Sequence, residues 1–355
     1  MSRRKGIVGS VVGLAAAAAG AVLVADRKVA ATRREGIAAQ DEFAEPVAER
    51  GGFLRAEDGV ALYYEEDGPL DAPLTVVFVH GFCLNRNDFL FQRRALLEEF
   101  GDGIRIVSFD QRSHGRSDRS PVEHATIDQL GADLDHVITS LVPDGPVVLV
   151  GHSMGGMTIL ALAENRAALF GPDGRVAGVV LISTTTGKLA TITFGLPAAL
   201  ARVGGPVLPL ILRGARREAA LIERGRARVT DVAWVFVKRL AFGGPVSAGC
   251  VEFLTRMIGE TPVDVIADFY PALMDHDKLD AVGVLSDTRV SVICGERDLL
   301  TPPAHSRTIA DALPDAELVV VAGAGHQVLM EQPGPVNSSI VRVVEDVLGS
   351  ARCPQ

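Results

Sequence analysis

The stretch PVVLVGHSMGG, residues 146–156, decides the fold because a single serine between glycines joins a buried-strand pattern to a helix pattern. The apolar run ends in the spacing Gly-x-Ser-x-Gly, from Gly151 to Gly155, and MTILALA follows with helical character. A residue on so sharp a strand-to-helix turn takes a strained backbone conformation. Its neighbours two places away are crowded together and must be small. The turn lifts the hydroxyl of Ser153 toward a helix N-terminus, which favours negative charge.

Outward from this turn, apolar or alternating runs and helical patterns follow one another along the chain. The further strand-like runs are residues 59–67, 74–81, 105–110, 178–184, 289–295 and 316–323. The helical patterns between them are residues 89–100, 127–141, 157–170 and 305–313. Strands that alternate with helices predict an α/β fold, with a mostly parallel central sheet covered by helices on both faces.

One long interval breaks this alternation and divides the chain into parts. Between about residues 185 and 287 the apolar patterns resemble short helices separated by Gly and Pro, and this interval contains the only tryptophan, Trp234. We interpret it as a helical cap inserted between two strands. The expected organisation is an N-terminal apolar segment and linker, a first core part, the cap and a second core part, over residues 1–50, 51–185, 186–287 and 288–350.

Two loops near the C-terminus offer partners for the serine. A serine hydroxyl is a poor nucleophile unless a base contacts it and a third group orients that base. GERDLLTP, residues 295–302, follows a strand pattern and contains Asp298, and GAGHQVLMEQP, residues 323–333, follows the last strand pattern and contains His326. Both loops lie where sites form in open α/β sheets, just past the carboxyl ends of strands. The chain order is Ser, Asp, His.

An anion hole for the reaction needs backbone N–H groups directed at the developing oxyanion. The residue after the serine, Met154, offers one such amide. HGFCLN, residues 80–85, follows an early strand pattern and offers Phe82 as the second donor. Gly81 in the same loop would let the backbone approach the substrate closely.

The other polar residues around these motifs are expected to be structural. Asp110 and Asp118 follow an earlier strand pattern, where salt bridges within a turn suit them better than the role of the triad acid. His80 is expected beneath the anion-hole loop, and His152 is expected to pack or hydrogen-bond beside the serine turn. His276, in MDHD, is expected at a solvated helix end, with contact to the substrate as the alternative.

These motifs together resemble the α/β-hydrolase superfamily, in particular its serine-nucleophile, esterase- or lipase-like members with a helical cap. The resemblance covers about residues 51–350 and rests on HGF at 80–82, DQRSHGRSD at 110–118, GHSMGG at 151–156, GERDLLTP at 295–302 and GAGHQVLMEQP at 323–333. It implies an eight-stranded sheet and a triad of Ser153, Asp298 and His326, with Phe82 and Met154 as amide donors. The chain departs from the family at Ser113, a turn position where relatives often have glycine.

The resemblance implies hydrolysis of a lipophilic carboxylic ester through an acyl-enzyme. Epoxide and haloalkane hydrolases usually carry aspartate at the position of Ser153, which argues against both. Carbon–carbon bond hydrolases, thioesterases, lactonases and cofactor-free haloperoxidase-like enzymes keep the serine, and the local motifs do not separate them from esterases because specificity depends on the cap. A non-catalytic ligand-binding module of the same fold is the alternative from another class.

Composition and spacing bear on cofactors and partners. The formal net charge is −9 and no basic domain stands out, which argues against a nucleic-acid partner. His, Asp and Cys residues show no metal-ligand spacing, and the glycine-rich nucleotide loops GxGxxG and GxxxxGK[ST] are absent from the sequence. We therefore expect no metal and no cofactor, and a small lipophilic ester as the substrate.

The N-terminus carries a separate signal. Residues 7–24 contain no charged side chain and follow Arg3, Arg4 and Lys5. Their length just reaches that of a membrane span, so we expect a single N-terminal anchor, with export after cleavage following Ala31 as the alternative. Basic residues on both sides leave the orientation open.

Overall fold

The computed structural model describes residues 31–38, 40–171, 173–189 and 230–351. The expected membrane span over residues 7–24 and the first part of the expected cap lie outside these residues. Within the described ranges, none of the helices is both long enough and apolar enough to traverse a bilayer.

The core is an eight-stranded sheet with the order β1-β2-β4-β3-β5-β6-β7-β8. Only the pairs β1–β2 and β2–β4 are antiparallel, and the other five pairs are parallel. The predicted fold class is therefore confirmed. The strands are Arg50–Arg55 (β1), Ala61–Asp67 (β2), Thr75–Val79 (β3), Arg105–Phe109 (β4), Val147–His152 (β5), Val176–Ile182 (β6), Arg289–Gly295 (β7) and Glu317–Val321 (β8).

β1 is the strand that the sequence patterns did not predict. It reads RGGFLR, and its residues alternate between half-buried and exposed. Two consecutive glycines, Gly51 and Gly52, weaken the strand signal, because glycine is depleted in strands. β1 pairs with β2 along its whole length, and these backbone hydrogen bonds hold it in a strand despite its low local propensity.

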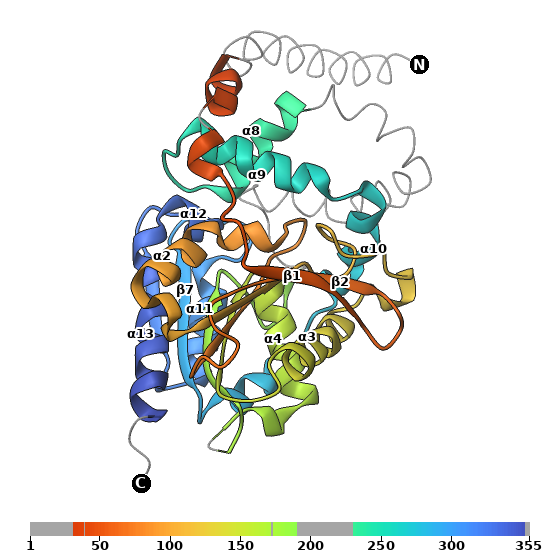
Figure 1. The fold of residues 1–355 in the computed structure, drawn as a ribbon. Helices are drawn as coiled ribbons and strands as arrows, with labels where there is room; N and C mark the ends of the chain where they lie inside the picture. Colours follow the sequence, from red (N-terminus) through yellow and green to blue (C-terminus); the bar gives the residue numbers. More distant parts are fainter. Residues whose placement is uncertain (1–30, 39, 172, 190–229, 352–355) are drawn as a thin grey trace, which may run out of the picture.

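Helices cover both faces of the sheet (Figure 1). One face packs against α2 (Leu90–Phe100) and α13 (Pro333–Ala351) around side chains such as Phe78 and Val150. The opposite face packs against α3, α4 and α11 around side chains such as Val77 and Leu149. The bounds of these three helices are Ile127–Leu141 (α3), Met154–Asn165 (α4) and Pro303–Ala312 (α11). Neighbouring positions along β3 and β5 thus face opposite layers, and this explains why both strands are continuously apolar.

The helix bounds differ from the sequence patterns in two places. α4 begins at Met154, three residues before the expected start, so the glycines after the serine belong to the helix itself. α13 was not expected, because its first residues, Pro-Gly-Pro, resemble a loop. Proline is tolerated in the first turn of a helix, where its missing N–H would have no acceptor.

Ser113 has φ +66°, the left-handed conformation that explains why relatives often have glycine there.

Three α-helices of the described residues lie between β6 and β7, in the interval expected to form the cap. They are α8 (Thr230–Ala241), α9 (Ala248–Glu260) and α10 (Val263–Met274); α8 and α9 lie side by side above the sheet in Figure 1, and α10 lies lower, to their right. A short 3-10 helix, η8 (Asp280–Leu285), returns the chain to β7.

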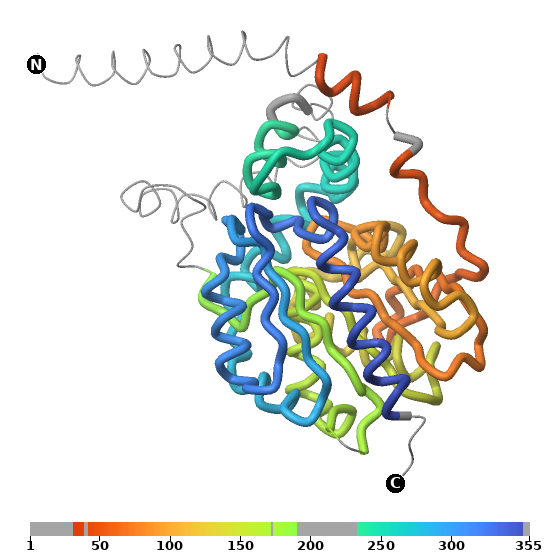
Figure 2. Tube along the Cα trace, turned by 90° about the vertical axis from the view of Figure 1, so that its left-hand side faces the viewer, coloured from red at the N-terminus to blue at the C-terminus, as the bar shows by residue number. Residues whose placement is uncertain are grey.

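The segment before β1 packs against both the cap and the core. Arg33 forms an ion pair of 2.9 Å with Glu252 of α9. Phe43 stacks on Phe253 of α9 with ring centroids 5.2 Å apart and meets Phe91 of α2 edge-on at 5.9 Å. Figure 2 shows this red segment running from the cap down the side of the body. Residues 31–38 and 40–50 are therefore part of the packed structure.

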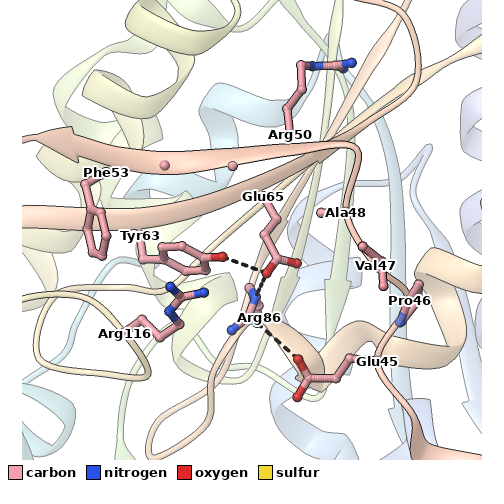
Figure 3. Close-up of a pocket in the computed structure, with 12 residues that line it drawn as sticks. Glu45, Pro46, Val47, Ala48, Arg50, Phe53, Tyr63, Glu65, Arg86 and Arg116 are labelled. Carbon is pink, nitrogen blue, oxygen red and sulfur yellow. Dashed lines mark hydrogen bonds and ion pairs between the residues drawn. The ribbon is translucent and has the colours of Figure 1, made fainter.

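Between this segment and the sheet lies a hollow of about 610 Å³ (Figure 3). Its polar side chains are paired with one another. Arg86 Nε lies 2.8 Å from Glu65 and Arg86 Nη2 lies 3.1 Å from Glu45, while the hydroxyl of Tyr63 donates to Glu65 at 2.9 Å. Arg116 lies over the ring of Tyr63 at 3.7 Å. This network attaches the N-terminal segment to β2 and to the loop after β3.

Candidate active site

Ser153 lies on a strained turn between β5 and α4. Its backbone angles are φ +50° and ψ −116°, and a side chain rarely tolerates this positive φ. A Cβ added to Gly155 would lie 1.8 Å from the carbonyl oxygen of Val79, and one added to Gly151 would lie 2.7 Å from the backbone of Gly155. The crowding that the Gly-x-Ser-x-Gly spacing predicts is present, and it forces the serine side chain out of the sheet.

The three residues singled out from separate loops meet at this turn. The Oγ of Ser153 lies 3.0 Å from Nε2 of His326, and Nδ1 of His326 lies 2.9 Å from Oδ2 of Asp298. They come from the β5–α4 turn, the loop after β8 and the loop after β7. With Nδ1–H donating to the carboxylate, Nε2 is free to accept the serine proton. The arrangement can therefore activate a hydroxyl as a nucleophile.

Asp298 is held as a carboxylate by its surroundings. Its side chain is fully buried, and burial alone would raise its pKa. The ring of His326 and hydrogen bonds from Thr301 outweigh that effect and hold the pKa below the ordinary value. Thr301 contributes its backbone N–H to Oδ1 and its hydroxyl to Oδ2, each at 2.8 Å, and the N–H of Leu300 donates to Oδ1 at 2.8 Å.

Thr301 was not anticipated from the sequence, although it belongs to the quoted motif GERDLLTP. Its hydroxyl also lies 2.8 Å from the carbonyl oxygen of Ser183, which connects the acid loop to the end of β6. A partial signal was available, because an Asp side chain in a loop often accepts a hydrogen bond from the backbone two residues later, as Asp298 does from Leu300.

The loop after β3 lies against the serine. A Cβ added to Gly81 would lie 3.0 Å from Nδ1 of His152 and 3.3 Å from Cβ of Ser153, so a larger residue would fit only if these neighbours shifted slightly. Phe82 follows in a turn and is half-buried. Met154 is the first residue of α4, and the N–H groups of a first helical turn have no acceptor within the helix. Both predicted amide donors thus belong to residues at the edge of the serine turn.

An apolar cluster connects the serine turn to the cap. It joins residues of the turn and of the loop after β3 to the inner side of α10. Its members are Met154, Met157, Phe82, Leu189, Val265, Phe269 and Leu273, together with Ala125, Ile127, Leu130 and Ala161 beneath them. The side chains next to Ser153 therefore pack against hydrocarbon from α10.

The buried histidines differ in their contacts. His80 donates from Nδ1 to the carbonyl oxygen of Gly81 at 2.8 Å and accepts at Nε2 from the N–H of Gln111 at 2.9 Å. Burial lowers its pKa, which fits a neutral ring beneath the anion-hole loop. The expectation for His276 is wrong. Its side chain is 5 % exposed rather than solvated, and burial lowers its pKa to about 4.

One buried polar side chain beside the candidate site was missed altogether. Asp88, in the 3-10 helix η2 (Arg86–Phe89), is fully buried and contacts the loops that carry the serine, the histidine and Gly81. The sequence around it, NRND, is polar and resembles an exposed turn, so no periodic pattern marks the burial. Among the described residues, no three His, Cys, Asp or Glu side chains are grouped so as to hold a metal ion.

Comparison with known proteins places the chain in a family. Residues 76–338 match the alpha/beta hydrolase family. A non-heme chloroperoxidase of Streptomyces lividans is 28% identical over 83% of this chain and 99% of its own. A bifunctional esterase/perhydrolase of Acinetobacter calcoaceticus is 36% identical over 37% of this chain and 44% of its own. The solved structure of a thermophilic esterase from Thermogutta terrifontis has a TM-score of 0.63 at 25% identity, covering 84% of this chain and 99% of that one.

Proposed function

The chain belongs to the alpha/beta hydrolase family, and we propose that it is a serine hydrolase that cleaves a lipophilic carboxylic ester through an acyl-enzyme. The observation that carries this proposal is the continuous chain of contacts from Ser153 through His326 to Asp298, at 3.0 and 2.9 Å. A positioned base within hydrogen-bond reach of a hydroxyl, itself oriented by a buried carboxylate, is the arrangement that nucleophilic catalysis by serine requires.

The proposed reaction has two halves. His326 removes the proton of Ser153 as Oγ attacks the ester carbonyl carbon, and the amides of Phe82 and Met154 stabilise the oxyanion. The bond to the alcohol then breaks, and the alcohol leaves with the proton from His326. A water molecule gives a proton to the same ring and attacks the acyl carbonyl, which releases the acid and restores the serine. Asp298 holds the imidazole tautomer and stabilises the imidazolium throughout.

A lipophilic acyl group fits the surroundings of the serine. The apolar cluster around Met154, Phe82 and α10 borders the nucleophile on the cap side. Hydrocarbon side chains cannot satisfy the hydrogen bonds of a polar substituent, whereas they stabilise buried methylene groups by about 0.8 kcal/mol each. An esterase/perhydrolase relative and an esterase structural neighbour support an ester rather than a thioester or a carbon–carbon bond.

The test is hydrolysis of p-nitrophenyl esters from acetate to palmitate by the full-length chain, beside its Ser153→Ala variant. We expect turnover that peaks at an intermediate or long acyl chain and falls by about 10⁶-fold in kcat in the variant. A folded wild-type chain without ester turnover would contradict the proposal. Thioesters and carbon–carbon substrates would then be tried, and stoichiometric binding without turnover would indicate a binding module.

Perhydrolysis is a second candidate, favoured by the relatives described as a chloroperoxidase and as an esterase/perhydrolase. In that reaction hydrogen peroxide attacks the acyl-enzyme in place of water, and a peroxy acid leaves. Both reactions use the same acyl-enzyme at Ser153. Adding hydrogen peroxide to the ester assay separates them, because a perhydrolase yields peroxy acid in proportion to the peroxide while a strict esterase yields only the carboxylic acid.

We also propose that residues 7–24 attach the protein to a membrane, on the strength of their uncharged, apolar sequence. Membrane attachment would suit a lipophilic substrate. Extraction of membranes with alkaline carbonate should leave the uncleaved chain in the pellet. Its full release would contradict the anchor, and a mature N-terminus at residue 32 would show that the segment is a cleaved export signal.

A further inference from the structure

We propose that Asp88 is a positioning residue. Its buried carboxylate holds the anion-hole loop, the serine turn and the histidine loop at fixed positions relative to one another. This proposal rests on the proposed function of the same site. It concerns a residue outside the triad that touches none of the reacting atoms.

The contacts of Asp88 reach all three loops. Its Oδ2 accepts from the N–H of Gly81 at 3.2 Å and lies 2.7 Å from Nδ1 of His152, and its Oδ1 accepts from Nε2 of Gln327 at 2.5 Å. Each partner is the direct chain neighbour of a residue in the proposed machinery. Gly81 precedes the amide donor Phe82, His152 precedes the nucleophile, and Gln327 follows the catalytic histidine.

The ring of His152 extends this connection to the backbone of His326. Its Nε2 lies 3.3 Å from the carbonyl oxygen of His326, while its Nδ1 faces Asp88. A carbonyl oxygen and a carboxylate can only accept hydrogen bonds. When both bonds form, both ring nitrogens carry hydrogen and the pair is a buried ion pair. His326 is then held at its ring by Asp298 and at its backbone by His152.

The surroundings of the pair favour a positioning role over a stabilising one. Asp88 and His152 are both completely buried. Burial alone would raise the pKa of Asp88, but the charge and hydrogen bond of His152, together with the N–H of Gly81, hold it below the ordinary value. Buried ion pairs lose so much hydration that hydrophobic residues are often as stable in their place. The carboxylate of Asp88, which contacts three converging loops, is therefore expected to fix the positions of these loops more than to stabilise the fold.

The experiment compares Asp88→Asn with a matched control, Asp133→Asn, in the full-length chain. Asp133, on α3, is also a buried carboxylate, 2 % exposed, and Arg112 binds it through two contacts of 2.6 Å. We expect Asp88→Asn to lower kcat by about 10- to 100-fold with KM changed by less than about twofold, because small misplacements of reacting groups cost that much. The rate at which a fluorophosphonate labels Ser153 should fall in parallel. Asp133→Asn should lower the Tm and leave kcat and KM within about twofold.

A folded Asp88→Asn variant that keeps the kcat and labelling rate of the control would overturn the positioning role. If that variant does not fold, Gln327→Met takes its place. It removes one of the three connections, and it should lower kcat while KM stays the same. Wild-type kcat in Gln327→Met would also overturn the proposal. An inactive, unlabelled wild-type chain, in contrast, would refute the proposed function itself.

A spectroscopic readout needs no turnover. ¹⁵N NMR of the histidine rings should show hydrogen on both nitrogens of His152 in the wild-type chain and on only one in Asp88→Asn. A single protonated nitrogen in the wild-type ring would contradict the ion pair. His152 could then donate to Asp88 or to the carbonyl oxygen of His326, but not to both, so it would not connect the two residues.

Discussion

At the scale of single residues, steric exclusion and one strained backbone angle place Ser153, the proposed nucleophile. Ser153 adopts a positive φ because the chain must reverse from β5 into α4 with glycine backbone in contact on both sides. Strain of this kind costs on the order of 1–3 kcal/mol and persists only where the surrounding structure imposes it. The glycines that permit the turn are consequently as important to the site as the serine.

Gly155→Ala should therefore be strongly destabilising. Its added Cβ would lie 1.8 Å from the carbonyl oxygen of Val79, and neither backbone segment can move without displacing β3 or α4. We expect a loss of about 3 kcal/mol or more in the free energy of unfolding, at the upper end of overpacking effects. Urea denaturation measures it.

Gly259→Ala is the matched control, since an added Cβ there meets no atom within 4 Å and the residue lies in α9. Alanine exceeds glycine in helix propensity by about 1 kcal/mol, so this variant should be slightly more stable than the wild-type chain. Equal effects of the two substitutions would show that crowding does not restrict the serine turn.

At the scale of elements, the sequence predicted those parts of the site that depend on local pattern. Ser153, Asp298 and His326 each lie in a loop that follows a recognisable strand pattern. The carboxyl ends of parallel strands lie at one edge of the sheet, so these loops meet there. Asp88 and His276 were missed or misjudged, because their burial comes from elements distant in sequence and leaves no local periodicity. The strand β1 was missed because Gly51 and Gly52 weaken its local pattern, and pairing with β2 makes it a strand.

The element that precedes β1 should depend on Arg86 for its attachment. This side chain is 8 % exposed and faces Glu65, Glu45 and, at 3.5 Å, Asp110. Arg86→Met would remove the cation that faces the buried carboxylates of Glu65 and Asp110, although Glu65 keeps Arg93 at 3.2 Å. Removal of one partner from a buried ion pair costs up to about 3–5 kcal/mol. Thermal unfolding and proteolysis before residue 50 should both reveal the loss.

The comparison variant is Arg119→Met, which removes an ion pair of 2.6 Å with Asp264 on the surface of the cap. Both of its side chains are more than one-third exposed, and such pairs contribute about 0–1 kcal/mol. A similar Tm for the two variants would contradict the importance assigned to the Arg86 network.

At the scale of the whole molecule, buried neutral histidines should make stability depend on pH. Burial lowers the pKa of His114 to about 3 and that of His276 to about 4, whereas both titrate near 6.5 in the unfolded chain. Between about pH 6.5 and pH 4 the unfolded state therefore binds more protons. Stability falls as the pH falls, by about 1.4 kcal/mol per pH unit for each fully effective histidine.

Urea midpoints at pH 7.5, 6 and 5 measure this dependence. His276→Gln should reduce the slope, because the glutamine takes up no proton in either state. A stability that is constant from pH 7.5 to pH 5, or a slope unchanged in the variant, would show that the folded chain accommodates protonated rings at these positions.

The measurement that tests the central claim most directly is the identification of the acylated residue. The full-length chain is mixed with a p-nitrophenyl ester, quenched in acid during the first turnover, digested and examined by mass spectrometry. The account predicts an acyl group on Ser153, absent from the Ser153→Ala variant and removed when turnover is allowed to finish. Ester hydrolysis without an acyl group on Ser153, or with the acyl group on another residue, would contradict it.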